Sequence, residues 1–335
     1  MNFKKKIARK TLLPIGMKLG LDKAIRQLSG HSILNIMYHG VTNEDVTWFS
    51  PRHLNKDQFE QQLIYLKKNF DIIPIAEAFY LVQNNIKPKR KSITISFDDG
   101  YQNNLQTALP LLEEYHISAT FFISGVCAED MPVRCIWPDL ICALDYFNKN
   151  TPIEIGNLKF VNLIEAKSGE HLFDFLKKAP YPERDKIVEK LTLEYGLADK
   201  MKQVPEEAWK LMTKEEIIEL AGSTRAQIGS HGYLHYNLAN VDTETAAQEL
   251  VRSKSILESL VNTEVFMLAY PDGSYNDAVK NIAEQTGYRY QLAVAYKNPS
   301  DVNDHRILNR HGISSTTTFE SNMIALSLAF RTRGH

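Results

Sequence analysis

The sequence predicts an α/β fold of the barrel or doubly wound type, because strand-like and helix-like segments alternate along most of the chain. Short apolar runs rich in β-branched residues, which suit buried parallel strands, recur throughout. They lie at 33–38, 93–97, 119–124, 226–229, 265–270, 291–295 and 306–313. Segments with helical periodicity separate them, and several begin with the Asp, Ser or Thr typical of an N-cap. These helical segments lie at 56–69, 101–115, 243–262, 275–287 and 319–330.

One long segment, residues 127–212, breaks this alternation. It holds six of the 13 prolines and no run that would make a core strand, so we expect helices and loops there. We interpret it as a largely helical insertion in a domain that spans 31–330. Active sites of α/β folds are built from loops at the carboxyl ends of strands, so an insertion after the strand at 119–124 would lie near the site.

The composition is that of an ordinary soluble globular protein of 335 residues, with 44% hydrophobic and 24% charged residues and a net charge of −1. No nucleic-acid partner is expected. The charge is uneven, because residues 1–30 hold eight Lys or Arg and a single acid, Asp22. With apolar residues between its cations, this basic segment could lie on an anionic membrane surface. The alternative is an amphipathic helix packed on its own domain.

The start of the chain does not resemble a secretory signal peptide, because Lys18 interrupts the apolar run from Thr11 to Leu21. The three cysteines are odd in number and lack CxxC spacing, which argues against a disulfide framework. We therefore expect a cytoplasmic protein, which could also touch the inner face of the membrane.

The strand at 93–97 ends in two adjacent carboxylates, in the run Ser96-Phe97-Asp98-Asp99-Gly100. Successive side chains of a strand point to opposite faces, so both carboxylates can face one site only if the backbone turns, which Gly100 permits. The alternative is a simple turn and helix N-cap, which Asp-Asp-Gly also suits.

Two histidines, His231 and His235, follow the strand at 226–229 with a spacing that puts both imidazoles on one side of a helical turn. Alone, this spacing also fits two unrelated surface histidines. The carboxyl ends of the strands of an α/β fold gather at one face, however, which brings this pair towards the two carboxylates. One carboxylate and two imidazoles make a metal site with positions open for water and a substrate oxygen, and the second carboxylate is free to act as a base.

Two further strand ends carry candidate residues. His39 follows the strand at 33–38 and could protonate a departing amine near neutral pH, although a histidine in an ordinary turn is the alternative. The run Tyr270-Pro271-Asp272-Gly273 follows the strand at 265–270. It suits a simple turn, and its functional interpretation is a backbone N–H aimed at a developing oxyanion.

Together these motifs resemble the polysaccharide deacetylase family, also called the NodB-homology family or carbohydrate esterase family 4. The SFDDG run at 96–100 matches the family's TFDDG motif, which implies Asp98 as the catalytic base and Asp99 as a metal ligand. His231 and His235 match its histidine motif as the other two ligands. The resemblance covers most of 33–313 outside the insertion, and it implies a distorted (β/α)7 barrel.

Two departures from the family pattern concern the groups around the base. The third motif, Arg-x-Pro-Tyr-Gly, reads Ala-Tyr-Pro-Asp-Gly at 269–273, so the arginine that would brace the catalytic aspartate is missing there, and no closing Leu-x-His motif is evident. In a permuted branch that includes poly-N-acetylglucosamine deacetylases, the arginine comes from a later strand and an N-terminal Tyr-His supplies the acid. Arg310 and His39 resemble these two residues, with His311 as the competing acid.

The resemblance implies a metal-dependent hydrolase that removes the N-acetyl group from an amino sugar, in a glycan or in a nucleotide-linked or lipid-linked precursor for the cell envelope. Tyr270 and Asp272 would then contact the substrate or its oxyanion. Zinc suits the ligand set, with cobalt, nickel or iron as alternatives. The rival functions are a deformylase or another metal amidohydrolase that uses the same residues, and a non-catalytic carbohydrate-binding relative.

Overall fold

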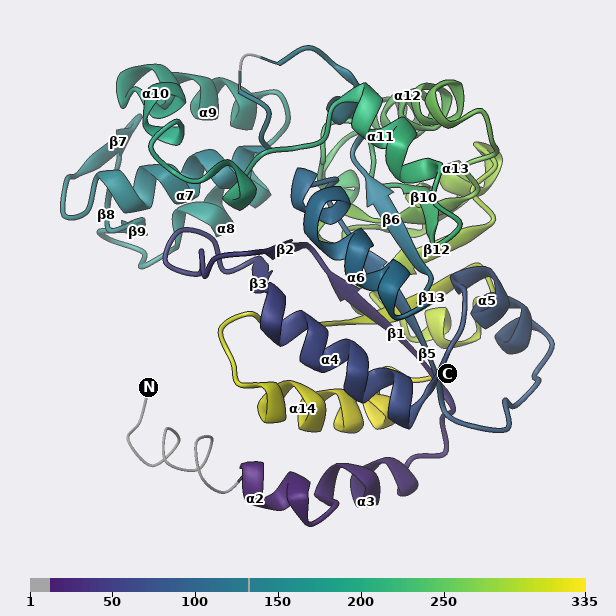
Figure 1. Cartoon of the computed structure of the whole chain (residues 1–335). Coiled ribbons are helices and arrows are strands. Elements are labelled where there is room, and N and C mark those ends of the chain that lie inside the picture. The colour runs from purple at the N-terminus through teal and green to yellow at the C-terminus, as the bar shows by residue number, and fades with distance from the viewer. Residues whose placement is uncertain (1–12, 132) are drawn as a thin grey trace.

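Seven parallel strands close into a barrel that helices surround (Figure 1), in a computed structural model that describes residues 13–131 and 133–335. Around the ring the order is β1, β13, β12, β11, β10, β6 and β5, and β5 pairs with β1 to close it. The strands are β1 (Ile33–Tyr38), β5 (Ser92–Phe97), β6 (Ala119–Ile123), β10 (Ala226–Ser230), β11 (Met267–Ala269), β12 (Tyr290–Ala293) and β13 (Ile307–Gly312). Each overlaps one of the seven predicted strands, so the predicted α/β barrel is confirmed.

The barrel is irregular beside β5. Its first residues, Ser92 and Ile93, pair with the two-residue strand β4 (Asp71–Ile72), whereas its last residues, Ser96 and Phe97, pair with β6. One edge of β5 is therefore shared between two strands, and β4 extends the sheet outside the ring. The carboxyl end of β5, where the two adjacent aspartates follow, belongs to the closed part of the barrel.

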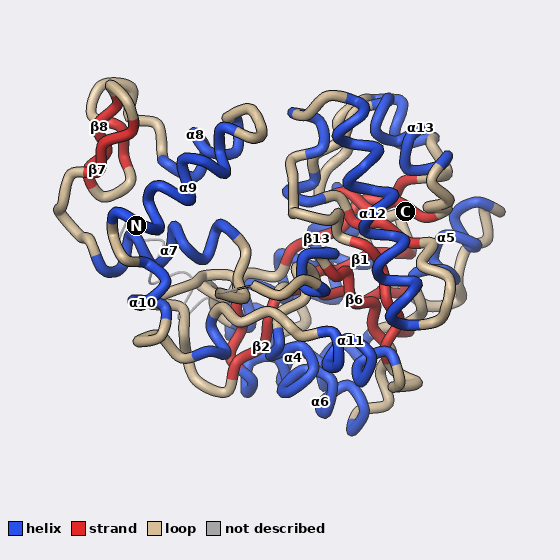
Figure 2. The backbone as a smooth tube through the Cα atoms, turned by 90° about the horizontal axis from the view of Figure 1, so that it is seen from above, coloured by secondary structure: helices blue, strands red, loops and turns tan. Residues whose placement is uncertain are grey.

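Helices cover the outside of the barrel (Figures 1 and 2). They are α4 (Lys56–Asn69), α5 (Ile75–Gln83), α6 (Leu109–Glu114), α11 (Lys214–Ala221), α12 (Thr243–Val261), α13 (Asp277–Gln285) and α14 (Phe319–Thr332). In α4, α12, α13 and α14 the side chain of the N-cap residue accepts a hydrogen bond from a backbone N–H of the first turn. These N-cap residues are Asn55, Asp242, Asn276 and Thr318.

The helices differ from the prediction in two respects. Helices α5 and α11 are not among the predicted ones, although α11 begins with a capping box in which Thr213 and Glu216 bind each other's backbone N–H. The helix predicted at 101–115 is instead a π-helix, η2 (Asn104–Ala108), followed by α6. Pro110 lies in the first turn of α6, where its missing N–H is tolerated, and a continuous α-helix through this position would lose a hydrogen bond.

The insertion between β6 and β10 packs around a hydrophobic cluster of its own, which includes Trp137, Phe160 and Leu172, and it stands to the left of the barrel in Figure 2. Its helices are α7 (Trp137–Phe147), α8 (Leu172–Lys178), α9 (Glu183–Glu194) and α10 (Leu197–Met201). Its three-stranded antiparallel sheet, not predicted from the sequence, consists of β7 (Ile153–Ile155), β8 (Leu158–Val161) and β9 (Ile164–Glu165). Val46 and Phe49 join the cluster from the loop between β2 (Gly40–Thr42) and β3 (His53–Asn55), which ties the insertion to the barrel.

The first helices of the described chain, α2 (Leu13–Lys18) and α3 (Leu21–Gln27), run beside α14 on the outside of the molecule (Figure 1). The first twelve residues of the predicted basic segment lie outside the described residues. Among the helices that the structure describes, none combines the length and the apolar composition needed to cross a membrane.

Candidate active site

A cavity of about 430 Å³ lies at the carboxyl ends of the barrel strands. Its lining brings together residues from the ends of β1, β5, β10 and β11 with residues of the insertion. The predicted site residues that line it are His39, Asp98, Asp99, His231, His235, Tyr270 and Asp272. The insertion contributes Ile136, Pro138, Cys142, Phe173 and Lys177. The insertion therefore lies at the candidate site, and of the candidate residues from the sequence only Arg310 and the competing acid His311 do not line the cavity.

Asp99, His231 and His235 converge on one point of the cavity wall. The Nε2 atoms of His231 and His235 lie 3.4 Å and 3.3 Å from Asp99 Oδ1. One ligand atom from each residue lies within 4.8 Å of the others, and all three side chains are buried. Asp99 has a φ of 76° and Gly100 a φ of 92°, so the backbone turns in the left-handed region immediately after the strand. This turn lets both aspartates of the motif face the cavity.

The hydrogen bonds of this set fit a bound cation. His231 Nδ1 lies 2.8 Å from the carbonyl oxygen of Ala269, which can only accept, so Nδ1 carries the proton and Nε2 presents a lone pair. Asp99 Oδ1 is buried and has no hydrogen-bond donor. Two acceptors that face each other inside the protein are a suitable site for a divalent metal ion.

A carboxylate from α12 supports the loop that carries both histidines. Glu249 Oε2 accepts the backbone N–H groups of Tyr233 and Leu234, at 3.1 Å and 2.9 Å. The Glu249 side chain is buried, no cation among the described residues forms an ion pair with it, and burial raises its pKa to about 7. Nothing in the sequence distinguishes Glu249 from the other glutamates of α12, so sequence reasoning missed this residue.

Asp98 is held by a buried arginine from another strand. Arg310 Nη1 and Nη2 donate to Asp98 Oδ1 and Oδ2 at 2.6 Å and 2.8 Å, and Nη1 also lies 3.3 Å from Ser96 Oγ. Burial would raise the pKa of Asp98, but the charge and the hydrogen bonds of Arg310 outweigh it and keep the pKa below its usual value. The structure therefore brings Arg310 and Asp98 together in the bidentate contact that a brace requires.

The two histidines that compete for the acid role lie in different surroundings. His39, half-buried between β1 and β2, lines the cavity; burial lowers its pKa, and the charges of Asp99 and Asp98 oppose that effect. His311 follows Arg310 in β13, and adjacent residues of a strand point to opposite faces. Burial lowers the pKa of His311 to about 4, and it does not line the cavity. Of the two, only His39 faces the aspartates.

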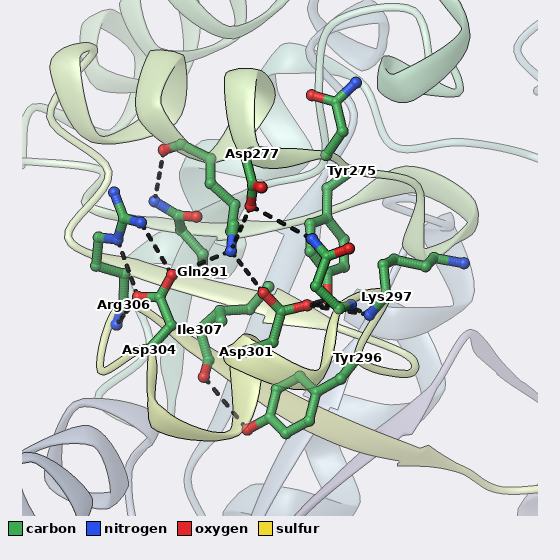
Figure 3. Close-up of polar contacts among 12 residues, drawn as sticks. Tyr275, Asp277, Gln291, Tyr296, Lys297, Asp301, Asp304, Arg306 and Ile307 are labelled. Atoms are coloured by element: carbon green, nitrogen blue, oxygen red, sulfur yellow. Dashed lines mark hydrogen bonds and ion pairs between the residues drawn. The ribbon is translucent and has the colours of Figure 1, made fainter.

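Tyr270 and Asp272 differ in what their side chains reach. The hydroxyl of Tyr270 donates to Gln291 Oε1 at 2.6 Å, so it is engaged in the support of the barrel. Gln291 in turn belongs to the polar network of Figure 3, in which Tyr275 and a buried Lys280 both bind Asp301. Asp272 has a φ of 54° in the turn η6 (Pro271–Gly273) and pairs with Lys177 of the insertion at 2.7 Å.

Sequence reasoning also missed a buried cluster beside the cavity that joins the barrel to the insertion. Arg52, before β3, donates from Nε to the Tyr101 hydroxyl at 3.1 Å and forms an ion pair with Asp139 of α7. The Tyr101 hydroxyl also contacts Asp139, at 3.2 Å. Arg52 lines the cavity, so its guanidinium is held in place at the wall. These three residues are far apart in the sequence, and no short motif contains them.

Two solved structures, one of them of a deacetylase, share this fold. The Streptococcus pyogenes deacetylase PplD, in complex with acetate, matches with a TM-score of 0.55 and 18% identity, over 87% of this chain and 97% of that chain. IcaB from Ammonifex degensii matches with a TM-score of 0.56 and 16% identity, over 90% of this chain and 99% of that chain. The predicted (β/α)7 barrel of the NodB-homology type is thus confirmed.

Two Bacillus subtilis proteins are similar in sequence. YxkH, described as a polysaccharide deacetylase, is 22% identical over 255 residues, which is 76% of this chain and 61% of YxkH. The peptidoglycan-N-acetylmuramic acid deacetylase PdaA is 32% identical over 95 residues, 28% of this chain and 32% of PdaA. The chain thus spans less than two thirds of either relative. The family model "Polysaccharide deacetylase" matches residues 85–147 and 178–291, more than half of the chain. The chain therefore belongs to the polysaccharide deacetylase family.

Proposed function

We propose that the protein is a metal-dependent hydrolase that removes the N-acetyl group from an amino sugar. The observation that carries the proposal is the pairing of two units in one cavity: a convergent Asp99, His231 and His235 set, and a carboxylate, Asp98, that a buried arginine holds ionised. Metal hydrolases need these two units together, because a ligand set positions the water and the substrate and a free base activates the water.

Asp99, His231 and His235 would hold the ion, and a divalent cation bound there supplies Lewis acidity towards the acetamide carbonyl and a water molecule. Asp98 removes a proton from the attacking water, since Arg310 keeps the carboxylate ionised and oriented. His39, which lines the same cavity, protonates the departing amine. A backbone N–H at Asp272 stabilises the oxyanion. The products are acetate and a free amino sugar.

Zinc is the metal that we propose, because two imidazoles and one carboxylate are typical zinc ligands, with cobalt, nickel or iron as substitutes. The proposed substrate is an N-acetylated sugar of a glycan or of a lipid-linked or nucleotide-linked precursor of the cell envelope. PdaA, the relative named for peptidoglycan, supports a cell-envelope glycan. The cytoplasmic location and the contact of residues 1–30 with a membrane stay predictions.

The test is metal analysis of the purified protein followed by an assay of acetate release from N-acetylated glucosamine oligomers and from peptidoglycan fragments. We expect bound zinc in a one-to-one ratio and acetate release that Asp98→Asn abolishes. Asp45→Asn, which changes an exposed aspartate outside the cavity, is the matched control and should keep full activity. Equal activity of Asp98→Asn and the unchanged protein would rule out the proposed base.

The same assay separates the rival functions. Formate release from N-formylated sugars without acetate release would identify a deformylase. Binding of the oligomers without release of either acid, in protein that contains zinc, would identify a non-catalytic carbohydrate-binding protein. Both results would overturn the proposed deacetylase.

A further inference from the structure

The inner side of α3 is fixed to the domain by a buried ion pair. Arg26 Nη1 donates to Asp22 Oδ2 at 2.9 Å and to Ser327 Oγ of α14 at 3.1 Å, and it also binds the Tyr65 hydroxyl of α4 at 2.6 Å. Asp22 and Arg26 are only 2% and 7% exposed. Because these polar groups face inward and are fully engaged, the orientation of α3 about its own axis is set. The opposite side of the helix therefore faces away from the domain.

The exposed side chains of α2, of α3 and of the residues that connect and end them, which we call the α2–α3 outer face, combine apolar groups with cations. Leu19 and Leu28 are 82% and 74% exposed, and Ile15 and Leu21 are about half exposed. Lys18 and Lys23 are exposed on the same two helices. The single acid of residues 1–30 is Asp22, which is turned inward, so within residues 13–30 the outer face presents no carboxylate. Exposed leucines at this density need a partner or an apolar environment.

We infer that the α2–α3 outer face docks on an anionic membrane surface, with the leucines at the acyl boundary and the lysines on lipid phosphates. Amphipathic helices bind bilayers through this combination of apolar and cationic side chains. The sequence just before α2 adds cations at Lys4, Lys5, Lys6, Arg9 and Lys10. Charge complementarity favours an anionic bilayer over a second copy of the chain, because an identical face would repel this one. This inference does not depend on the proposed deacetylase reaction.

The position of this face leaves the cavity accessible. In Figure 1, α2 and α3 lie below α14, whereas the insertion that borders the cavity lies at the upper left. No residue of α2 or α3 lines the cavity. A chain docked through the outer face can therefore still admit a saccharide, and substitutions on that face should leave the cavity unchanged.

The test is flotation of the full chain with vesicles of phosphatidylcholine, with or without phosphatidylglycerol. We expect binding to the anionic vesicles only. The variant Leu19→Asp/Leu28→Asp should bind at least about 100-fold more weakly, because each buried leucine contributes about tenfold or more. Lys18→Gln/Lys23→Gln should bind about 25-fold more weakly, since each cation near an anionic surface contributes about fivefold. Leu193→Asp is the matched control, because Leu193 is 76% exposed on α9 of the insertion, and it should bind normally.

Each remaining outcome overturns the inference. Equal binding to neutral and anionic vesicles would exclude an anionic surface as the partner, and unchanged binding by both double variants would exclude this face as the docking surface. Sedimentation velocity that shows a dimer, lost in Leu19→Asp/Leu28→Asp, would identify a second copy as the occupant. Unchanged thermal unfolding of the variants shows that a loss of binding does not come from a loss of folding, because the buried Asp22–Arg26 pair is untouched.

Discussion

Replacing Arg310 with methionine should lower the free energy of unfolding by about 3–5 kcal/mol, which is the cost of leaving a buried charge without its partner. The structure makes this the expected range, because both ends of the pair are buried: the side chains of Arg310 and Asp98 are 0% and 3% exposed. The contact is bidentate, at 2.6 Å and 2.8 Å, whereas the Nε2 atom of His231 lies 4.0 Å from Asp98 Oδ2. Methionine fills part of the same space without a charge, which limits the loss of stability that an empty cavity would add.

The matched control is Arg289→Met. Arg289 makes the same bidentate contact with Glu264, at 2.8 Å and 2.9 Å, but these side chains are 54% and 53% exposed. An exposed pair of this geometry contributes about 0–1 kcal/mol, so the control should unfold almost like the unchanged protein. The assay is denaturant unfolding of metal-free protein, which removes the contribution of metal binding from both measurements.

Asp98→Asn completes a double-mutant cycle with Arg310→Met. Each single change leaves one buried charge unpaired, whereas the double variant removes both charges, so its cost should fall short of the sum by about 2 kcal/mol or more. Deacetylase activity should stay lost in all three variants, because the base is absent or misoriented. Additive costs, or a cost of Arg310→Met no larger than that of Arg289→Met, would refute the reasoning.

Three further predictions concern the rest of the site. Removal of metal with a chelator should abolish acetate release and lower the melting temperature. Added zinc should restore the activity and the melting temperature of the unchanged protein but not those of Asp99→Ala. Activity that survives chelation would contradict a metal site. Glu249 has its pKa raised by burial from 4.5 to about 7, so its ionisation opposes folding as the pH rises. Denaturant unfolding should therefore show Glu249→Gln gaining up to about 3 kcal/mol on the unchanged protein between about pH 5 and pH 8, and a constant difference would exclude the effect. Lys177→Met should raise KM more than it lowers kcat, because Lys177 pairs with Asp272 at the cavity wall. The control is Lys178→Met, which should change neither KM nor kcat. The Lys178 side chain is 73% exposed and pairs with Glu170.

The fold could be predicted where the physical signal is local. A buried parallel strand shows as a short apolar run, so all seven barrel strands appear in the sequence within a few residues of their observed bounds. The strands β7, β8 and β9 are two to four residues long and partly exposed, which is too short for alternation to stand out. The start of helix α11 can be predicted from the sequence, because Thr213 and Glu216 have the spacing of a capping box, and they form one in the structure.

The residues of the candidate site also fall into two groups, those that a local sequence motif marks and those that no local feature marks. Asp98, Asp99, His231 and His235 follow strand ends in short motifs, so their neighbourhood follows from the rule that the carboxyl ends of strands share one face. Glu249, Arg52 and Lys177 reach the site from a helix, a loop and the insertion. Their contacts depend on how elements far apart in sequence pack, and a glutamate, arginine or lysine on a surface helix or loop has no local feature that marks it.

The missing arginine of the third motif therefore says little about activity, because the closure of the barrel supplies an equivalent. In β1, Asn35 pairs with Arg310 of β13 on one side and with Thr94 of β5 on the other, so β13 and β5 flank the same strand. The long Arg310 side chain needs only to extend along the barrel interior, past Ser96, to reach Asp98. A guanidinium acts on a carboxylate through distance and orientation, and neither depends on which strand carries it. If Arg310→Lys, which keeps the charge but loses the bidentate contact, retains stability better than it retains acetate release, the orientation of Asp98 is what the arginine provides. If Arg310→Lys retains both stability and acetate release, the charge alone accounts for the brace.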